Sequence, residues 1–239
     1  MRITHEQTVY QLSFMAKWFP VNCYFVEEEN SLTLIDTALP FSKRAILETA
    51  KQIGKPIKRI VLTHVHSDHI GSLDGLKADL PEVEIFLPER ELKLLHGDKT
   101  LEPGEGNLPV KGGVPRNSKT QPDTLLKEGD RIGSLVAIAA PGHTPGMMAF
   151  LDVRNSILLA GDAMQTRGGI AVAGDLRFRF PFPALATWDK ERAIASVENL
   201  LTYRPTIIGV GHGDFLYEPE SKVKHAIEKA KKAIGVRMK

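Results

Sequence analysis

The sequence predicts an α/β protein made of two similar halves, because short apolar strands alternate with a few helices along the chain. One observation is a repeated hairpin pattern at Cys23–Asp36 and Met148–Asp162. Each copy has an apolar strand, a charged turn containing Asn-Ser, and a second apolar strand that ends in Asp. The other observation is that a helix-like segment and another apolar strand follow each copy. Chance similarity between two hairpins is the alternative to a true repeat.

The first half contains the clearest local signals. VNCYFV at Val21–Val26 and SLTLID at Ser31–Asp36 predict two strands joined by a polar turn. Ser42–Gly54 predicts a helix, since apolar residues recur at steps of three and four between an N-cap serine and a terminating glycine. RIVLTH at Arg59–His64 then predicts a short buried strand.

The second half follows the same order. After the hairpin at Met148–Asp162, the sequence predicts a helix at Asp189–Leu201 and a strand at Thr206–His212. SKVKHAIEKAKKAIG at Ser221–Gly235 predicts one amphipathic helix. Dimerisation through this helix and a solvated polar face are both open interpretations.

Composition limits the class of protein. The 239 residues carry a net charge of +2, an excess too small to predict nucleic-acid binding. The single cysteine, Cys23, excludes an internal disulfide and is expected to fill the core. The N-terminal residues lack the pattern of a signal peptide, and no apolar run is long enough to span a membrane. We therefore expect a cytoplasmic protein that acts without a membrane or nucleic-acid partner.

Two segments have no clear periodicity. Thr100–Asp123 is rich in Gly and Pro, and Gln165–Thr187 combines glycines with three phenylalanines. Irregular segments of this length inside a compact domain are often functional, so both are candidate lids. Surface insertions without a role in binding are the alternative.

Metal-binding residue types follow four separate apolar runs. Because neighbouring strands can end at one edge of a sheet, the side chains at these ends can converge on one site. His64 and His66 lie two residues apart on an extended chain, so both rings point to one side. The candidate ligands are His64, His66, Asp68, His69, His143, Asp162 and His212.

This set of ligands predicts a site for two metal ions. Imidazole and carboxylate suit zinc, with iron or manganese as alternatives. Seven such groups exceed what one tetrahedral ion needs and fit two ions that share a carboxylate. The competing interpretation, that all seven are ordinary core or turn residues, is disfavoured by their shared position after apolar runs.

At these residues the chain resembles the metallo-β-lactamase superfamily. THVHSDHIGSL fits its H-x-H-x-D-H motif, and PGHTPG, LLAGDA and GVGHG fit its later motifs in the same order. The resemblance spans nearly the whole chain. It implies a four-layer αββα sandwich of two pseudo-equivalent halves, with residues 1–239 forming a single domain and the metals at one edge of the sheets.

The resemblance also implies a role for each candidate. His64, His66 and His143 would bind one metal, Asp68, His69 and His212 would bind the other, and Asp162 would bridge the two. Asp36 would hold the histidine loop in place.

The implied activity is hydrolysis of a small ester, lactone or thioester by a metal-bound hydroxide. Asp68 would orient that hydroxide or take its proton. Ser67 lies inside the motif, but local hydrogen bonding is its expected role. The alternatives are a phosphodiesterase or organophosphate hydrolase of the same fold, and a metal-binding protein without turnover.

The sequence narrows the substrate only in part. Asp162 argues against a true β-lactamase, which lacks the bridging carboxylate. Gln165 stands where the lactone-cleaving relatives usually carry a tyrosine, which weakens the lactonase interpretation. Trp18, Phe19 and Phe180 are candidates, with Gln165, to line a pocket for a small, partly apolar substrate. Core packing is the alternative for these aromatic residues.

Overall fold

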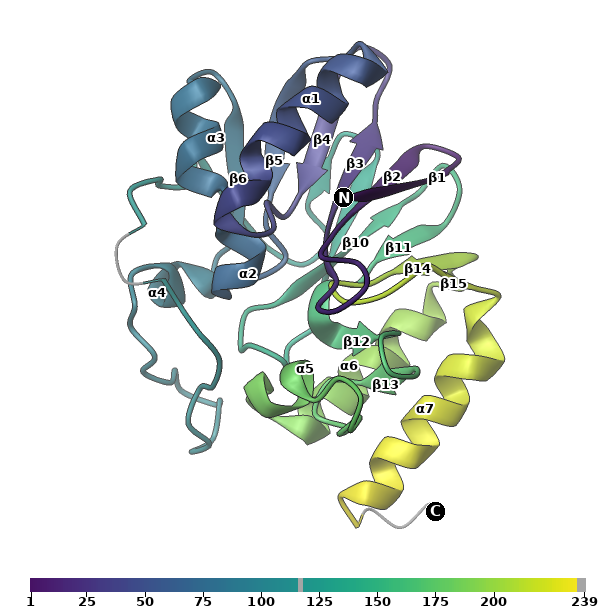
Figure 1. Cartoon of the computed structure of the whole chain (residues 1–239). Coiled ribbons are helices and arrows are strands. Elements are labelled where there is room, and N and C mark those ends of the chain that lie inside the picture. Colours follow the sequence, from purple (N-terminus) through teal and green to yellow (C-terminus); the bar gives the residue numbers. More distant parts are fainter. Residues whose placement is uncertain (116–117, 236–239) are drawn as a thin grey trace.

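The computed structural model describes residues 1–115 and 118–235, so residues 116–117 of the first candidate lid lie outside the described part. Two mixed sheets form its centre (Figure 1). The first sheet has seven strands in the spatial order β1 (Arg2–Glu6), β2 (Val9–Phe14), β3 (Val21–Glu27), β4 (Leu32–Ile35), β5 (Ile57–Val61), β6 (Glu84–Pro88) and β7 (Thr124–Leu126).

The second sheet has six strands, and a separate two-stranded ribbon lies beside it. The spatial order in the second sheet is β15 (Leu216–Tyr217), β14 (Ile207–Gly209), β11 (Ile157–Leu159), β10 (Met148–Asp152), β9 (Leu135–Ala139) and β8 (Arg131–Ile132). The ribbon consists of β12 (Met164–Gln165) and β13 (Ala171–Val172).

The helices vary in length from one turn to about four. They are α1 (Lys43–Ile53), α2 (Ser67–Ile70), α3 (Leu73–Asp79), α4 (Glu91–Leu95), α5 (Phe182–Ala186), α6 (Lys190–Thr202) and α7 (Pro219–Ala233), with 3₁₀ turns at Pro40–Ser42 and Gly161–Ala163. None of the helices in the described ranges has both the length and the apolar character needed to cross a bilayer.

The sheets pack face to face with helices on both outer sides. Alternate residues of β3 separate the layers: Cys23 and Phe25 pack with α1 residues such as Ile46, while Tyr24 and Val26 pack against the second sheet. A third apolar cluster joins the outer face of the second sheet to α6 and α7. Figure 1 shows α1 and α3 on one side of the sheets and α6 and α7 on the other. The predicted four-layer αββα sandwich is confirmed.

The two halves share one order of elements. The antiparallel hairpin β3–β4 is followed by α1 and then by β5, which pairs parallel with β4. The hairpin β10–β11 is likewise followed by α6 and then by β14, which pairs parallel with β11. The repeated sequence pattern therefore corresponds to equivalent hairpins in the two sheets.

Some local expectations need correction. Ser42 was expected to cap α1, but its side chain makes no cap hydrogen bond, because a 3₁₀ turn at Pro40–Ser42 precedes the helix. Gly54 does end that helix in a left-handed conformation, with its N–H bonded to the oxygen of Ala50. Asp189 caps α6 by accepting hydrogen bonds from two backbone N–H groups. Cys23 is buried in the core, as expected.

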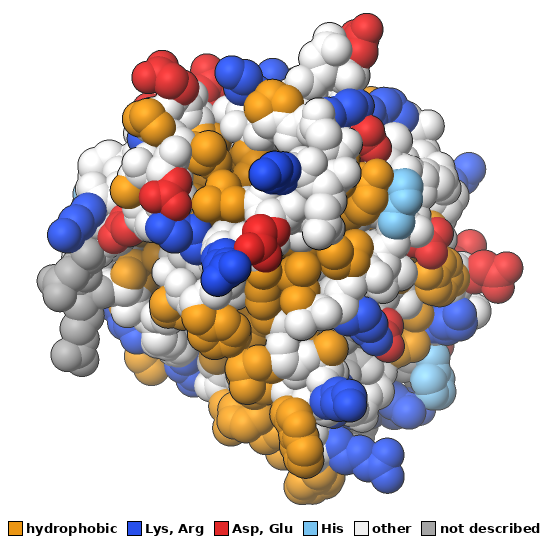
Figure 2. All heavy atoms as spheres, turned by 45° about the horizontal axis from the view of Figure 1, so that its top comes forward, with side chains coloured by type: hydrophobic (Ala, Val, Ile, Leu, Met, Phe, Trp, Pro, Cys, Tyr) orange, Lys and Arg blue, Asp and Glu red, His pale blue; other side chains and the backbone are white. Residues whose placement is uncertain are grey.

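Acidic and basic side chains are interspersed on the face drawn in Figure 2, and apolar side chains gather toward its lower part. This mixture agrees with the small net charge of +2.

Candidate metal centre

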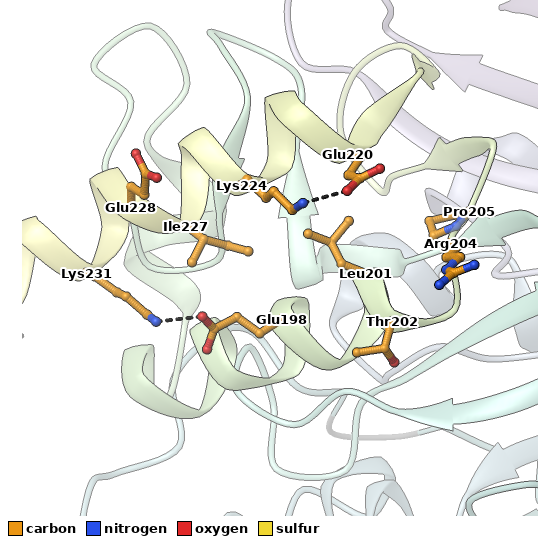
Figure 3. Close-up of a pocket in the computed structure, with 10 residues that line it drawn as sticks. All are labelled: Glu198, Leu201, Thr202, Arg204, Pro205, Glu220, Lys224, Ile227, Glu228 and Lys231. Carbon is orange, nitrogen blue, oxygen red and sulfur yellow. Dashed lines mark hydrogen bonds and ion pairs between the residues drawn. The ribbon is translucent and has the colours of Figure 1, made fainter. Parts of the chain in front are cut away.

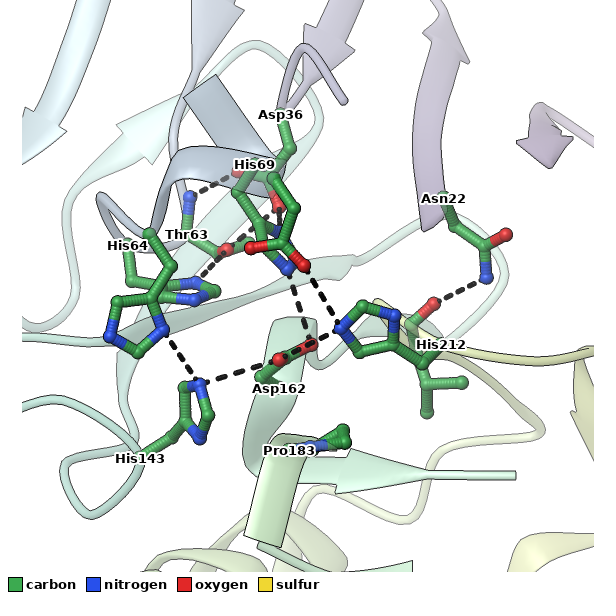
Figure 4. A network of polar contacts seen from close by, with 12 residues as sticks. Asn22, Asp36, Thr63, His64, His69, His143, Asp162, Pro183 and His212 are labelled. Atoms are coloured by element: carbon green, nitrogen blue, oxygen red, sulfur yellow. Dashed lines mark hydrogen bonds and ion pairs between the residues drawn. The ribbon is translucent and has the colours of Figure 1, made fainter. Parts of the chain in front are cut away.

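The seven candidate ligands come from loops at one edge of the two sheets. β5 leads into the segment of His64 and His66, and the short helix α2 that follows carries Asp68 and His69. The remaining three residues follow strands of the second sheet: His143 after β9, Asp162 after β11 and His212 after β14. Figure 4 shows five of the seven side chains pointing toward one another from both sheets, namely His64, His69, His143, Asp162 and His212.

The ligand atoms form two compact groups. His64, His66 and His143 each offer a ring nitrogen, and these three atoms lie within 4.8 Å of one another. Asp68, His69 and His212 form a second group by the same measure. The two groups are those that the family resemblance implies.

Asp162 lies between the groups. Its Oδ2 is 3.3 Å from His143 Nε2 and 3.2 Å from His212 Nε2, whereas its Oδ1 is 3.4 Å from His69 Nε2. One carboxylate therefore faces imidazoles of both groups, an arrangement that suits a bridging ligand.

Asp36 orders two of the histidines from outside the centre. Thr63 Oγ1 donates to Asp36 Oδ2 at 2.8 Å and lies 3.0 Å from His64 Nδ1. Because the hydroxyl proton is already used, this oxygen must accept a hydrogen bond from His64 Nδ1. His69 Nδ1 lies 2.8 Å from the same carboxylate oxygen, which can only accept. In both rings the proton is therefore on Nδ1, and Nε2 faces the centre.

The other histidines are oriented by oxygen acceptors as well. His66 Nε2 lies 3.1 Å from the backbone oxygen of Lys111, and His212 Nδ1 lies 2.7 Å from that of Pro20. His143 Nδ1 lies 3.1 Å from a Thr187 hydroxyl that already donates to a backbone oxygen. Each outer nitrogen must therefore donate, which leaves the inner nitrogen of each of the five rings as the one that can bind a metal ion.

Buried polar atoms without hydrogen-bond partners mark the centre. Within the described ranges, His64 Nε2, His69 Nε2 and Asp162 Oδ1 are buried and accept or donate no hydrogen bond. Leaving such atoms unpaired is costly, so a native structure is expected to provide a partner. A divalent metal ion satisfies ring nitrogens and carboxylate oxygens together, and the residues present fit such ions.

Charges differ between the two groups. Burial lowers the pKa of His64 well below its ordinary value and lowers that of His143 to about 3, so both rings stay neutral. Burial also acts to lower the pKa of His212, but the Asp162 carboxylate raises it overall. Burial acts to raise the pKa of Asp162, yet His212 and His69 bring it well below its ordinary value. Asp162 is therefore ionised, as a bridging ligand must be.

A cavity of about 620 Å³ opens directly onto the centre. Five of the seven candidate ligands border it, namely His66, Asp68, His143, Asp162 and His212. Its apolar walls are formed by Phe19, Leu39, Pro40, Phe182, Pro183, Leu185 and Ala186. Both candidate lid segments border this cavity, the first through Gly112 and Gly113 and the second through Phe182, Pro183, Leu185 and Ala186.

Two predicted pocket residues lie next to the centre. Phe19 borders the cavity, and its ring meets that of His212 edge-on with 5.7 Å between the ring centres. Phe180 is buried behind the wall, 5.0 Å from Phe19 and 5.3 Å from His212 between ring centres. Phe180 thus supports the cavity wall without bordering the cavity.

The other two predicted pocket residues do not border the cavity. Gln165 is buried, and its Nε2 donates to the backbone oxygens of Arg167 at 2.7 Å and Phe180 at 3.1 Å, so it ties two loop segments together. Trp18 is 83% exposed and borders a separate surface hollow beside Met15. Trp18 and Phe19 both bond to the oxygen of Met15 in one tight turn, which directs only Phe19 toward the centre.

Sequence reasoning missed the residues that hold the His212 loop. Asn22 Nδ2 donates to the backbone oxygens of Val210 at 2.8 Å and Gly213 at 2.7 Å, and the Tyr24 hydroxyl donates to Val210 at 2.6 Å. The signal was present, since Asn22 is a polar residue within an otherwise apolar strand. Through these bonds β3 of the first sheet fixes a ligand loop of the second.

A larger hollow of about 700 Å³ lies away from the centre, between α6 and α7. Figure 3 shows two ion pairs among its charged side chains, Lys224 with Glu220 and Lys231 with Glu198. None of the described residues that line it is His, Asp or Cys. It has the character of a solvated groove between helices and offers no cluster of metal ligands.

Comparisons with known proteins agree with this geometry. The protein YobT of Bacillus subtilis (strain 168) is 53% identical over 232 residues, which cover 97% of this chain and 100% of YobT. The probable metallo-hydrolase YflN of the same organism is 30% identical over 214 residues, covering 80% of each chain. The solved structure of DIM-1 metallo-β-lactamase matches with a TM-score of 0.73 at 15% identity, covering 97% of each chain, and this likeness shows the fold.

The family model described as the metallo-beta-lactamase superfamily matches residues 16–212, a range that contains every candidate ligand. The chain therefore belongs to the metallo-β-lactamase superfamily of metallo-hydrolases.

Proposed function

We propose that this protein is a hydrolase that uses two zinc ions to cleave a small ester, lactone or thioester. One observation carries the proposal: five of the seven candidate ligands border a cavity large enough for a small molecule. Structural zinc sites are closed by their protein ligands, whereas catalytic sites keep a position open to substrate. The open side of this centre therefore favours turnover over a purely structural role.

The two groups of side chains would each hold one ion, with Asp162 between them. Such a pair of ions lowers the pKa of water to about 7 and polarises a carbonyl oxygen. The five histidines are already oriented by their outer hydrogen bonds, so the ligands need little rearrangement on binding.

Asp68 is placed to handle the proton of the attacking water. Its side chain is 29% exposed, it borders the cavity, and its Oδ2 lies 3.5 Å from His212 Nε2. Its other oxygen forms no hydrogen bond with the described residues, so it is available to orient water or accept a proton. Ser67 is not placed to act as a nucleophile, because its hydroxyl donates to the backbone oxygen of Gly113 at 2.8 Å. We therefore infer direct attack by water without a covalent intermediate.

The cavity wall supports a small substrate with an apolar part. Phe19, Leu39 and Phe182 border the cavity together with four further apolar residues, and no lysine or arginine is among its described lining residues. A phosphodiester would leave its charge facing these walls, so carbonyl substrates are favoured over phosphodiesters. The proposed partner is accordingly a small molecule.

A substrate panel tests the proposal. Zinc-loaded protein is assayed against lactones, thioesters, simple esters and phosphodiesters, alongside His66→Ala and His96→Ala. His66 belongs to the centre, whereas His96 is an exposed histidine whose ring bonds to Gln121. We expect turnover of at least one carbonyl substrate that His66→Ala loses and His96→Ala keeps.

Two results would overturn it. Zinc-loaded protein that binds two ions and cleaves nothing in the panel would point to a metal-binding protein without turnover. Equal turnover by wild type and His66→Ala would show that the cleavage does not occur at this centre.

A further inference from the structure

Glu91, the first residue of α4, is a buried carboxylate with no charged partner. Its side chain is 0% exposed, and among the described residues it forms no ion pair. The neighbouring Arg90 forms no ion pair with it, since that guanidinium bonds to both oxygens of Glu105, at 2.6 and 2.8 Å. Burying an unpaired carboxylate is costly, so its presence calls for a structural or functional reason.

Both oxygens of Glu91 accept hydrogen bonds from backbone groups of ligand loops. Oε2 accepts from Val65 N at 3.0 Å, and Val65 lies between His64 and His66 in the chain. Oε1 accepts from Gly146 N at 2.9 Å, in the loop that follows His143. One carboxylate thus ties together the two loops, one from each sheet, that carry the three-histidine group.

The position of Glu91 is fixed by its surroundings. Leu94 and Leu95 anchor α4 in the core of the first half. Gly146 can approach only because it lacks a side chain: an added Cβ would lie 2.8 Å from Glu91 N and 2.9 Å from Glu91 Oε1. The close contact between Glu91 and Gly146 therefore depends on both the anchored helix α4 and the glycine.

The second group of ligands is held by other residues. His69 bonds to Asp36, and His212 bonds to the backbone oxygen of Pro20, and Glu91 takes part in neither bond. We propose that Glu91 is a positioning residue for the ion held by His64, His66 and His143 and has little influence on the other ion. This inference rests on the two-ion arrangement of the proposed function.

Zinc affinity, measured by competition with a chromogenic chelator, tests the inference without reference to turnover. Each group is measured separately, in an Asp68→Ala background that leaves the three-histidine group and in a His143→Ala background that leaves the other. Glu91→Gln keeps the size of the side chain, but its amide nitrogen cannot accept a hydrogen bond, so one loop is released. We expect affinity to fall by about 10–100-fold in the Asp68→Ala background and to stay the same in the His143→Ala background.

Asp74→Asn is the matched control. Asp74 also accepts backbone hydrogen bonds, from Lys119 and Thr120, and none of its hydrogen bonds with the described residues involves a ligand loop. It should lower stability without changing either zinc affinity. Equal losses at both groups, or no loss at the three-histidine group, would overturn the inference. Wild type that binds no zinc would refute the proposed function and the inference with it.

Hydrogen exchange on the wild type covers the case in which Glu91→Gln does not fold. If Glu91 holds the loops in advance, the amides of Val65 and Gly146 are protected in metal-free protein as well as with zinc. Amides that exchange freely until zinc is added would contradict a positioning role.

Discussion

The hairpin β10–β11 has a buried aspartate near each of its two ends, and the hydrogen bonding of these two carboxylates differs. At the metal-centre end, Asp162 is 3% exposed, and its Oδ1 has no hydrogen-bond partner among the described residues. At the other end, Asp152 is 0% exposed, but its Oδ1 accepts from Arg154 Nε at 2.9 Å and its Oδ2 accepts from Thr8 Oγ1 at 2.8 Å. The same residue type is thus fully paired at one end and left incomplete at the other.

This difference in hydrogen bonding distinguishes a carboxylate that stabilises the fold from one that is suited to binding a metal ion. A paired buried carboxylate needs nothing further and holds the turns of the two halves together, since Arg154 also donates to the backbone oxygen of Glu27 at 2.9 Å. A buried carboxylate that lies among oriented imidazoles and keeps one oxygen without a hydrogen bond is suited to binding a metal cation. We therefore expect equivalent substitutions at the two ends to have different consequences.

The largest expected effect comes from Asp162→Asn. The amide cannot bridge two cations, so turnover should fall by about 10³-fold or more, and bound zinc should fall with it. Kinetics of kcat/KM and metal analysis by mass spectrometry measure both. The matched change, Asp152→Asn, should leave zinc content and turnover intact while lowering the free energy of unfolding by about 1–3 kcal/mol. Full zinc occupancy in Asp162→Asn would contradict the comparison.

Removal of metal is expected to have the next largest effect. Zinc at about 1,000 times its dissociation constant stabilises the folded state by about 4 kcal/mol. For a chain of this size, its removal should lower the Tm by about 8–16 °C. Differential scanning calorimetry with and without chelator measures the shift. The shift should persist in Asp152→Asn and nearly vanish in Asp162→Asn, and an equal shift in both variants would refute the proposed role of Asp162.

A smaller effect is expected from Gly112→Ala, which acts on one ligand only. A Cβ at this position would lie 2.1 Å from His66 Nε2, so the ring must move away from its place beside His143. Zinc affinity of the three-histidine group should fall by about 10–100-fold. Gly113→Ala is the control, because its Cβ would meet only Ser67 Oγ at 3.6 Å. Equal affinities for the two variants would show that His66 tolerates displacement.

The smallest expected effect is the acid dependence of the paired end. Burial acts to raise the pKa of Asp152, but hydrogen bonds from Arg154 and Thr8 bring it below its ordinary value. A carboxyl with a lower pKa in the folded chain contributes stability above its unfolded pKa of about 3.9, and that contribution is lost as pH falls through the folded value. Urea unfolding of metal-free protein should show wild type more stable than Asp152→Asn by about 1–3 kcal/mol near neutral pH. This difference in stability between the two proteins should shrink in acid. A difference that grows in acid would contradict the lowered pKa of Asp152.

Much of the fold and of the centre was predictable because the signals are local. Strands such as Val21–Val26 are short apolar runs, and the histidines follow such runs directly. The pocket was less predictable, because Trp18 and Phe19 are adjacent in sequence and only their shared turn decides which one faces the centre. Glu91 could not be found at all, since its role depends on contacts with two loops that are distant in the chain.

Anomalous diffraction at the zinc edge, on crystals of the zinc-loaded protein, tests the central claim most directly. The account predicts two peaks about 3.5–4 Å apart, one beside His64, His66 and His143 and the other beside Asp68, His69 and His212, with Asp162 in contact with both. A single peak, or peaks that lie away from Asp162, would contradict it.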